Sequence, residues 1–225
     1  GRVRARRIAL ATNAYSHLLP GIAHRQCPAF TYLVATEPLS PERLDSIGWR
    51  GREGLEDARN LLHYFRLSPD GRLLMGGGPV GIAFGRSMGH DAHERAFRHL
   101  EEYIRRVFPS LAGVAITHRW GGPFSVTLGL VPALGYLHAP DAVYSVGCIG
   151  HGVALTPYSG LILAELLLER RTERTERWFV GRRGFGWPSE PLRIAAAAVV
   201  RSCLAIEDAW CERRGLGDGV PRSRV

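Results

Sequence analysis

Hydrophobic and polar positions along the chain predict helices and strands in mixed order. Between residues 90 and 108, apolar side chains recur every three or four positions, which places them on one face of a helix. A similar amphipathic pattern predicts a helix over residues 192–213. Residues 29–36, 61–67 and 114–120 form shorter apolar or alternating runs, which are typical of strands. The pattern favours the α/β class, or α+β if the elements are simply counted.

Turn and cap residues define several of these elements more closely. Ser-Pro-Asp-Gly at residues 68–71 is a strong hairpin turn, because proline and glycine supply the backbone angles that a turn requires. A returning strand over residues 72–75 is expected to lead into a glycine loop at residues 76–78. Ser40, followed by proline and glutamate, predicts the start of a short helical turn.

The stretch at residues 141–171 is the one around which the rest of the chain is organised. It opens with an apolar strand at residues 142–146 and continues through a turn that contains three glycines. A helix is expected from about residue 157 to residue 169, with Thr156 as its N-cap and Pro157 in the first helical position.

Such a turn has a defined chemistry. Glycine has no Cβ and tolerates positive φ, so the backbone can lie against a flat ligand. A helix that begins directly after the turn points its free N–H groups and its positive dipole end at that ligand. The pattern predicts a site for an electron-rich or anionic group, although an ordinary strand-to-helix connection would share the same spacing.

The run GCIGHGVALTPYSGLILAELLLE at residues 147–169 resembles the C-terminal flavin-binding motif of the D-amino-acid oxidase-like family of FAD-dependent oxidoreductases. That family includes glycine, sarcosine and γ-glutamylputrescine oxidases. The resemblance extends from about Ile8 to Trp210 and is similar to the second half of such an enzyme, most of all in the γ-glutamylputrescine oxidase branch. It implies FAD as the cofactor. The implied cofactor-binding residues are Gly147, Gly150, His151, Gly152, Val153, Ala154, Leu155 and Thr156.

A second flavin-side segment lies near the beginning of the chain. Residues 7–15, RIALATNAY, read as an apolar strand that breaks at Asn13. In the family, a similar segment ends a strand beside the FAD, so the resemblance adds Asn13 to the implied cofactor-binding residues. The resemblance also implies that His151 could stabilise negative charge on the reduced flavin ring; a packing role for His151 is the alternative.

The resemblance implies a domain layout. Residues 1–20 and 118–171 would belong to a partial Rossmann-like FAD-binding domain, and residues 21–117 to an antiparallel-sheet substrate domain. Residues 172–225 would form a charged link, a C-terminal helix and a disordered tail after Gly215. Family members begin with a strand, a G-x-G-x-x-G turn and a helix that cradle the pyrophosphate, whereas the G-x-G-x-x-G match at residues 76–81 of this sequence follows a predicted strand but opens no helix. We therefore expect the N-terminal half of the FAD site to be missing and to come, if it exists, from elsewhere in the same chain or from another chain.

Four residues are candidates for the substrate side of the flavin. His63, Tyr64 and Arg66 lie on the predicted strand at residues 61–67, and Trp120 lies on a later one. Alternation puts His63 on one face of its strand and Tyr64 and Arg66 on the other, and which face meets the flavin is left open. A structural role is an equal alternative for each of them.

One departure from the family pattern bears on the substrate. Amino-acid oxidases of the family usually carry an arginine four residues after the tryptophan that corresponds to Trp120, and it pairs with the substrate carboxylate. Phe124 takes that arginine's place and Gly129 takes the usual acidic position, while Thr127 and Pro132 keep the family spacing. The departure points toward an amine whose carboxylate, if present, lies far from the oxidised C–N bond.

The expected function is FAD-dependent oxidation of an amine or amino-acid C–N bond to an imine by hydride transfer, as in γ-glutamylputrescine oxidase. Its partner would be a small-molecule substrate, and oxidase and dehydrogenase chemistry both stay open. The alternative is a non-catalytic fragment or binding module that retains the fold without binding FAD tightly.

Composition disfavours a nucleic-acid partner, a metal site and a membrane span. The net charge of +8 invites a nucleic-acid partner, yet all 29 basic residues are arginine, dispersed and without interleaved aromatic residues, so we expect no nucleic acid. The four cysteines show no metal-binding spacing and read as free thiols of a reducing, cytoplasmic compartment, so no metal is expected. No apolar run is long enough for a membrane span.

Overall fold

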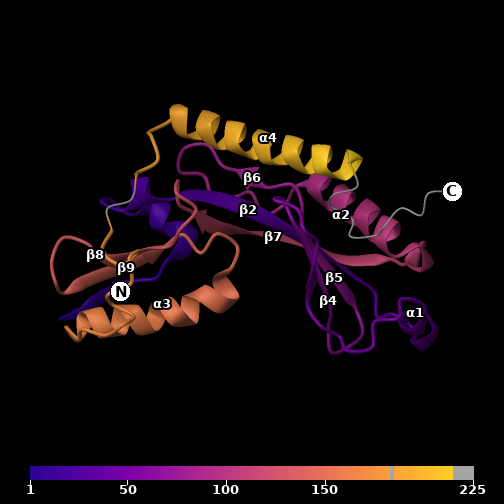
Figure 1. Ribbon diagram of the computed structural model, residues 1–225, viewed down its shortest axis with the longest axis horizontal. Helices are drawn as coiled ribbons and strands as arrows, with labels where there is room; N and C mark the ends of the chain where they lie inside the picture. Colours follow the sequence, from indigo (N-terminus) through magenta and orange to yellow (C-terminus); the bar gives the residue numbers. More distant parts are fainter. Residues whose placement is uncertain (183–184, 215–225) are drawn as a thin grey trace. The chain divides into compact units, whose positions relative to one another are not determined.

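The computed structural model describes residues 1–182 and 185–214, in which helices and sheets are mixed as expected (Figure 1). The chain divides into two compact units. Unit 1 comprises Gly1–Ala29, Ile82–Met88 and Pro123–Ala195, and unit 2 comprises Phe30–Gly81, Gly89–Gly122 and the residues from Ala196 onward. The predicted disordered tail after Gly215 lies outside the described residues.

Unit 1 contains a three-stranded sheet in the order β1-β9-β8. Strand β1 (Ile8–Leu10) runs parallel to β9 (Ala142–Val146), whose bounds are those predicted. Strand β8 (Ala133–Tyr136) runs antiparallel to β9. The first strand is shorter than the sequence suggested: it ends at Leu10, and Asn13 begins a 3-10 helix, η1 (Asn13–Leu18). The predicted break at Asn13 is confirmed, because its φ of 45° lies outside the extended region.

Helix α3 (Gly152–Leu167) packs on this sheet (Figure 1). Its inner face meets the sheet in an apolar cluster of Leu134, Val143, Ile162, Leu163 and Leu166. A second buried cluster, made of Ile22, Tyr144 and Val146, completes the core of the unit. A further 3-10 helix, η2 (Ala23–Arg25), belongs to the same unit.

The predicted start of α3 was wrong by more than one turn. The helix begins at Gly152, its N-cap is His151 rather than Thr156, and Pro157 lies inside it. The His151 carbonyl accepts from the N–H groups of Ala154 and Leu155, so the first turn already forms at the glycines. Pro157 removes only the bond to the Val153 carbonyl, and Val153 is 96% exposed, so water can hydrate that carbonyl. The Thr156 hydroxyl donates back to the Gly152 carbonyl at 2.6 Å.

Unit 2 contains most of a six-stranded sheet, in which the pairs β2–β5, β3–β4 and β4–β5 are antiparallel, as the resemblance implied. Its strand order is β3-β4-β5-β2-β6, with β7 also paired to β2. The strands are β2 (Cys27–Thr36), β3 (Leu55–Glu56), β4 (His63–Leu67), β5 (Leu73–Gly77), β6 (Gly81–Ile82) and β7 (Ile116–Val126). The first residues of β2 and the last of β7 belong to unit 1.

The predicted glycine loop at residues 76–78 needs correction, because Gly76 and Gly77 are part of β5. Gly76 pairs with Tyr64 on β4, and a Cβ at Gly76 would lie 2.5 Å from the Tyr64 ring. Glycine is therefore required inside this strand to let the Tyr64 ring lie over it.

Helices of unit 2 also differ from prediction mainly at their ends. Helix α1 (Pro41–Ser46) begins after Ser40, whose Oγ accepts from the Arg43 N–H as expected of an N-cap. Helix α2 (Glu94–Val107) begins four residues later than predicted, because the His93 side chain caps it. A 3-10 turn, η3 (Pro109–Leu111), follows α2, and α4 (Leu192–Arg213) has the predicted bounds.

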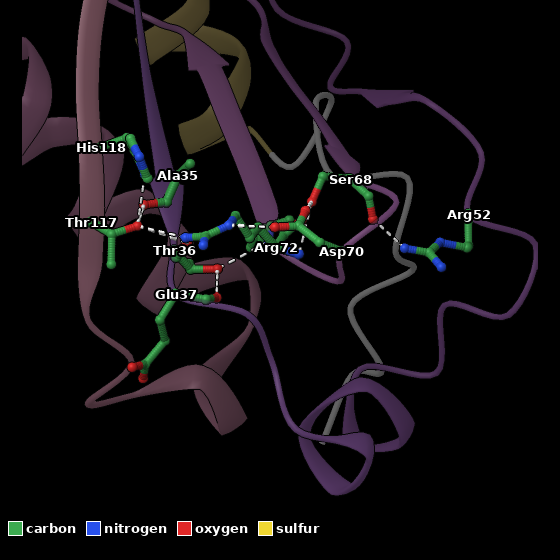
Figure 2. Close-up of polar contacts among 10 residues, drawn as sticks. Ala35, Thr36, Glu37, Arg52, Ser68, Asp70, Arg72, Thr117 and His118 are labelled. Atoms are coloured by element: carbon green, nitrogen blue, oxygen red, sulfur yellow. Dashed lines mark hydrogen bonds and ion pairs between the residues drawn. The ribbon is translucent and has the colours of Figure 1, made fainter.

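Arg72 links three strands beside the hairpin turn (Figure 2). Its Nε donates to Asp70 at 2.7 Å, and its Nη1 donates to the Thr36 carbonyl at 3.1 Å and to Thr117 Oγ1 at 2.9 Å. These bonds join the start of β5 to the end of β2 and to β7, while Ser68 and Gly71 close the turn itself. The arrangement confirms the hairpin predicted at residues 68–71.

Candidate functional site

A pocket of about 110 Å³ lies in unit 1, outside the carboxyl ends of β1 and β9. Parallel strands of an α/β sheet place their carboxyl ends at one edge, and ligands bind in the crevice outside that edge. The pocket is lined by Ala11, Asn13, Pro132, Ser145, Val146, Gly147, Cys148, Leu155, Thr156, Ser159, Gly160 and Leu163. It therefore joins the segment after β1, the glycine turn after β9 and the first turns of α3.

Gly147 is the glycine of the turn at which another residue would be strained. Its φ is 84°, and a Cβ at this position would lie 2.5 Å from Cγ2 of Thr127. Thr127 is itself fixed, because its Oγ1 donates to the Val131 carbonyl at 2.7 Å and accepts from the Val131 N–H at 3.1 Å. Gly150 also has positive φ, 83°, but a Cβ at Gly150 would meet no atom within 4 Å.

The N-terminus of α3 is open to a ligand. Within the described residues, the N–H groups of Gly152 and Val153 have no hydrogen-bond partner, and no side chain caps the helix. The first turn carries no acidic residue that would offset the positive end of the helix dipole. Two free donors and an uncompensated dipole favour an electron-rich or anionic group at this point.

Asn13 connects two walls of the pocket, the segment after β1 and the glycine turn after β9. Its Oδ1 accepts from the Ser125 N–H at 3.1 Å and from the Cys148 thiol at 3.4 Å. Ser125 Oγ in turn accepts from the Gly147 N–H at 2.8 Å. The segment after β1 and the glycine turn are thus tied together by side chains.

The pocket brings together four of the nine residues that the resemblance implied for the cofactor: Asn13, Gly147, Leu155 and Thr156. The other five, Gly150, His151, Gly152, Val153 and Ala154, belong to the adjoining turn and helix start but do not line the pocket. The cofactor role of all nine stays a prediction. Sequence reasoning missed Ser125 and Cys148, because a serine on a strand and an isolated cysteine carry no signal of their own.

The candidate substrate-side residues belong to unit 2, where the two faces of β4 differ. His63 is 2% exposed and stacks on Tyr103 of α2 with ring centroids 3.7 Å apart. Phe65, on the same face, packs edge-to-face on Phe108 at the end of α2. Tyr64 and Arg66 point to the face that α2 does not cover. Which face meets the flavin stays a prediction.

His63 is embedded in a polar cluster. Its Nδ1 lies 2.8 Å from Asp57 Oδ2, its Nε2 lies 2.9 Å from His99 Nε2, and the Tyr103 hydroxyl donates to Asp57 at 2.8 Å. Burial alone would raise the pKa of Asp57, but the hydrogen bonds from His63 and Tyr103 outweigh it and lower that pKa. Burial, followed by the bond to Asp57, raises the pKa of Tyr103 to about 12.

The remaining candidates are more accessible. Tyr64 is half-buried, its hydroxyl lies 3.3 Å from Thr31 Oγ1, and burial raises its pKa. Arg66 is exposed, and Trp120 is 39% exposed on β7. The catalytic roles of His63, Tyr64, Arg66 and Trp120 stay predictions.

Other kinds of site are not evident in the part of the chain that the structure describes. No three His, Cys, Asp or Glu side chains are grouped so as to hold a metal ion among residues 1–182 and 185–214. In the same ranges, no helix has both the length and the apolar character needed to cross a membrane.

Two known proteins are similar to this chain over about three quarters of its length. γ-Glutamylputrescine oxidoreductase of Escherichia coli (strain K12) is 36% identical over 169 residues, which are 74% of this chain and 38% of that protein. Probable oxidoreductase OrdL of Haemophilus influenzae is 37% identical over 72% of this chain and 36% of its own length. The chain thus spans well under half the length of these relatives.

Solved structures show the same fold. Glycine oxidase from Geobacillus kaustophilus superposes with a TM-score of 0.65 at 19% identity, over 81% of this chain and 46% of that chain. L-Proline dehydrogenase from P. horikoshii gives 0.62 at 22% identity, over 76% and 45%. Residues 1–166 match the family described as "FAD dependent oxidoreductase" (DAO). The chain therefore belongs to the DAO family of FAD-dependent oxidoreductases, whose cofactor is FAD.

Proposed function

We propose that the protein carrying this chain oxidises the C–N bond of an amine or amino acid to an imine with FAD. The observation that carries this proposal is the fold of the family's flavin motif. It forms an uncapped helix N-terminus beside a pocket at the carboxyl ends of two parallel strands. The name of the E. coli relative, γ-glutamylputrescine oxidoreductase, supports an amine as the substrate.

The residues present fit part of FAD. The open N–H groups of Gly152 and Val153 suit an electron-rich ring edge, and Gly150 and Gly152 leave room for a close approach. The pocket of about 110 Å³ is smaller than the roughly 300–1,000 Å³ typical of a site that takes a whole ligand. We assign the flavin end of FAD to this pocket. The pyrophosphate and adenosine we assign to residues outside this sequence, on the same or another chain, because its G-x-G-x-x-G at Gly76–Gly81 runs from β5 to β6 and opens no helix.

The two units would then have different roles in catalysis. Unit 1 contains the flavin-side residues, including Asn13 and the turn at Gly147, as a partial FAD-binding domain. The uncovered face of β4 in unit 2, with Tyr64 and Arg66, would contact the substrate, whereas His63 would support that strand from the α2 side. Bound FAD supplies the hydride acceptor. The chain's own contribution is to orient the amine and to stabilise negative charge through the helix N-terminus.

Phe124 favours amines over short α-amino acids. It stands where the family's carboxylate-binding arginine is found, and an apolar ring offers no charge-assisted bond to a carboxylate adjacent to the oxidised carbon. Arg66, exposed on the uncovered face of β4, is an alternative partner for a carboxylate at the far end of a longer substrate.

The alternative function is a binding module that keeps the fold without holding FAD, and the small pocket volume favours it. A visible absorption spectrum of the purified protein separates the two. Two flavin bands that bleach under anaerobic conditions with γ-glutamyl amines, and less with glycine, sarcosine or D-alanine, would support the amine oxidoreductase. A colourless protein that gains no flavin on titration with FAD would contradict it.

A further inference from the structure

Ser125, near the end of β7, holds both walls of the pocket through three hydrogen bonds. Its N–H donates to Asn13 Oδ1 at 3.1 Å, on the wall that follows β1. Its Oγ accepts from the Gly147 N–H at 2.8 Å, and its carbonyl accepts from the Ile149 N–H at 3.0 Å, on the wall that follows β9. Ser125 is 0% exposed, so water does not compete for these bonds.

Two of the residues that Ser125 holds have unusual backbone conformations. Asn13 has a φ of 45° and Ile149 a φ of 52°. Positive φ is uncommon for asparagine and an outlier for a β-branched residue such as isoleucine. Strained residues of this kind persist only where surrounding contacts over-determine the backbone, and they gather at ligand sites. Ser125 is the contact that both strained residues share.

The bond to Ser125 also determines which end of the Asn13 amide is free. Oδ1 accepts from the Ser125 N–H and from the Cys148 thiol, and both of these partners are donors. Two donors on the same side require the oxygen of the Asn13 amide, and not its NH2 group, to face them. The Nδ2 group of Asn13, a residue that lines the pocket, has no partner within the described residues and remains available as a donor.

We propose that Ser125 is a positioning residue of the FAD site, which fixes the Asn13 amide and the turn from Gly147 to Ile149 in the conformation that receives the flavin. This inference rests on the proposed function, since it says how that same site is held. Without Ser125 Oγ, the ligand would have to order the turn as it binds, and that cost weakens binding.

The test uses the protein that carries this chain, with the variants Ser125→Ala and Ser125→Thr. Alanine removes only the Oγ acceptor and leaves the buried Gly147 N–H without a partner, whereas threonine keeps a hydroxyl. Ser16→Ala is the matched control, because Ser16 is a fully buried serine of unit 1 that bonds Thr12 and does not line the pocket. Three quantities are measured: hydrogen exchange at the Gly147 amide without FAD, the Kd for FAD, and the visible spectrum of the bound flavin.

In Ser125→Ala we expect Gly147 exchange to rise and FAD binding to weaken, each about 10- to 100-fold, with a shift of the bound flavin's spectrum toward that of free FAD. Ser125→Thr should restore all three, and Ser16→Ala should leave the Kd and the spectrum unchanged. If the wild type binds FAD and Ser125→Ala changes neither the Kd nor the spectrum, this inference alone is overturned. The same holds if Ser16→Ala weakens FAD binding as much as Ser125→Ala does. A wild type that binds no FAD overturns the proposed function as well.

Discussion

The Nε2 atoms of His63 and His99 lie 2.9 Å apart in unit 2, with His63 buried and His99 partly buried. Because a carboxylate only accepts, His63 Nδ1 donates to Asp57, and a neutral His63 then accepts at Nε2 from His99. Burial, and next the charge of a protonated His63, lower the pKa of His99.

We expect His99 to make the protein less stable in mild acid. The ordinary pKa of histidine is 6.5, and the folded state lowers that of His99. At a pH below 6.5 the folded state therefore binds fewer protons at His99 than the unfolded state does. The free energy of unfolding should therefore fall as pH drops below that value, until the folded-state pKa is reached. Asp57, whose pKa is lowered, adds its own loss only below its ordinary value of 3.8. Urea denaturation between about pH 8 and about pH 5 measures the effect of the histidine.

His99→Gln should weaken this dependence, because glutamine does not titrate and can still donate to His63; His17, whose pKa burial also lowers, keeps its own contribution. His138→Gln, at an exposed histidine, serves as the control and should keep the wild-type slope. Equal slopes for wild type and His99→Gln would show that the buried pair does not contribute.

The glycine turn offers a matched pair of substitutions. Gly147→Ala and Gly150→Ala place alanine at nearly the same positive φ, 84° and 83°. The left-handed backbone alone costs roughly 1–2 kcal/mol. Gly147→Ala should cost roughly 1–3 kcal/mol more, because its Cβ would overlap Thr127 Cγ2. Urea denaturation measures both free energies.

Thr127→Ser tests the cause of that difference. Serine removes Cγ2 but keeps the hydroxyl that bonds Val131. In the Thr127→Ser background, Gly147→Ala should lose most of its extra cost. If the cost persists, the clash with Thr127 is not its source.

Gly152→Val should abolish flavin retention while sparing the fold. The nearest atoms to a Cβ at Gly152 lie 3.7–3.8 Å away, an ordinary contact distance, so the chain itself accepts a side chain there. A β-branched group would instead occupy the space in front of the helix N-terminus. Helix content by circular dichroism should match wild type, and full flavin occupancy in the variant would contradict the assignment of this turn to FAD.

Phe124→Arg should move the substrate preference toward short α-amino acids. A new charge-assisted bond to the carboxylate should raise kcat/KM for D-alanine about 10-fold or more relative to an amine without a carboxylate. Phe124→Leu, which adds no charge, should leave the ratio unchanged. Wild-type kcat/KM values for glycine, sarcosine or D-alanine equal to those for polyamine derivatives would refute the proposed preference.

Residues 1–225 by themselves should not bind FAD tightly. Much of the affinity for a dinucleotide comes from the pyrophosphate on a first glycine turn and helix, and the glycine motif of this sequence at Gly76–Gly81 opens no helix. Titration of the purified chain with FAD, followed by flavin fluorescence, measures the affinity. Sub-micromolar binding by a monomer would show that the chain is self-sufficient.

The local sequence pattern was enough to predict several elements of this protein. The strand Ala142–Val146, the helix Leu192–Arg213 and the hairpin turn at residues 68–71 follow from neighbours in sequence: apolar spacing, turn residues and caps. The family could be recognised for the same reason, because the motif at residues 147–169 is contiguous.

Only the tertiary structure decided the start of α3, the covered face of β4 and the role of Ser125. Helix α3 starts at Gly152 because the glycine turn, held by Ser125 from β7, already presents the His151 carbonyl to the first turn. His63 faces inward because α2 packs on that side of the sheet. Each of these outcomes depends on residues that are distant in sequence, and a local pattern holds no information about partners that only folding brings together.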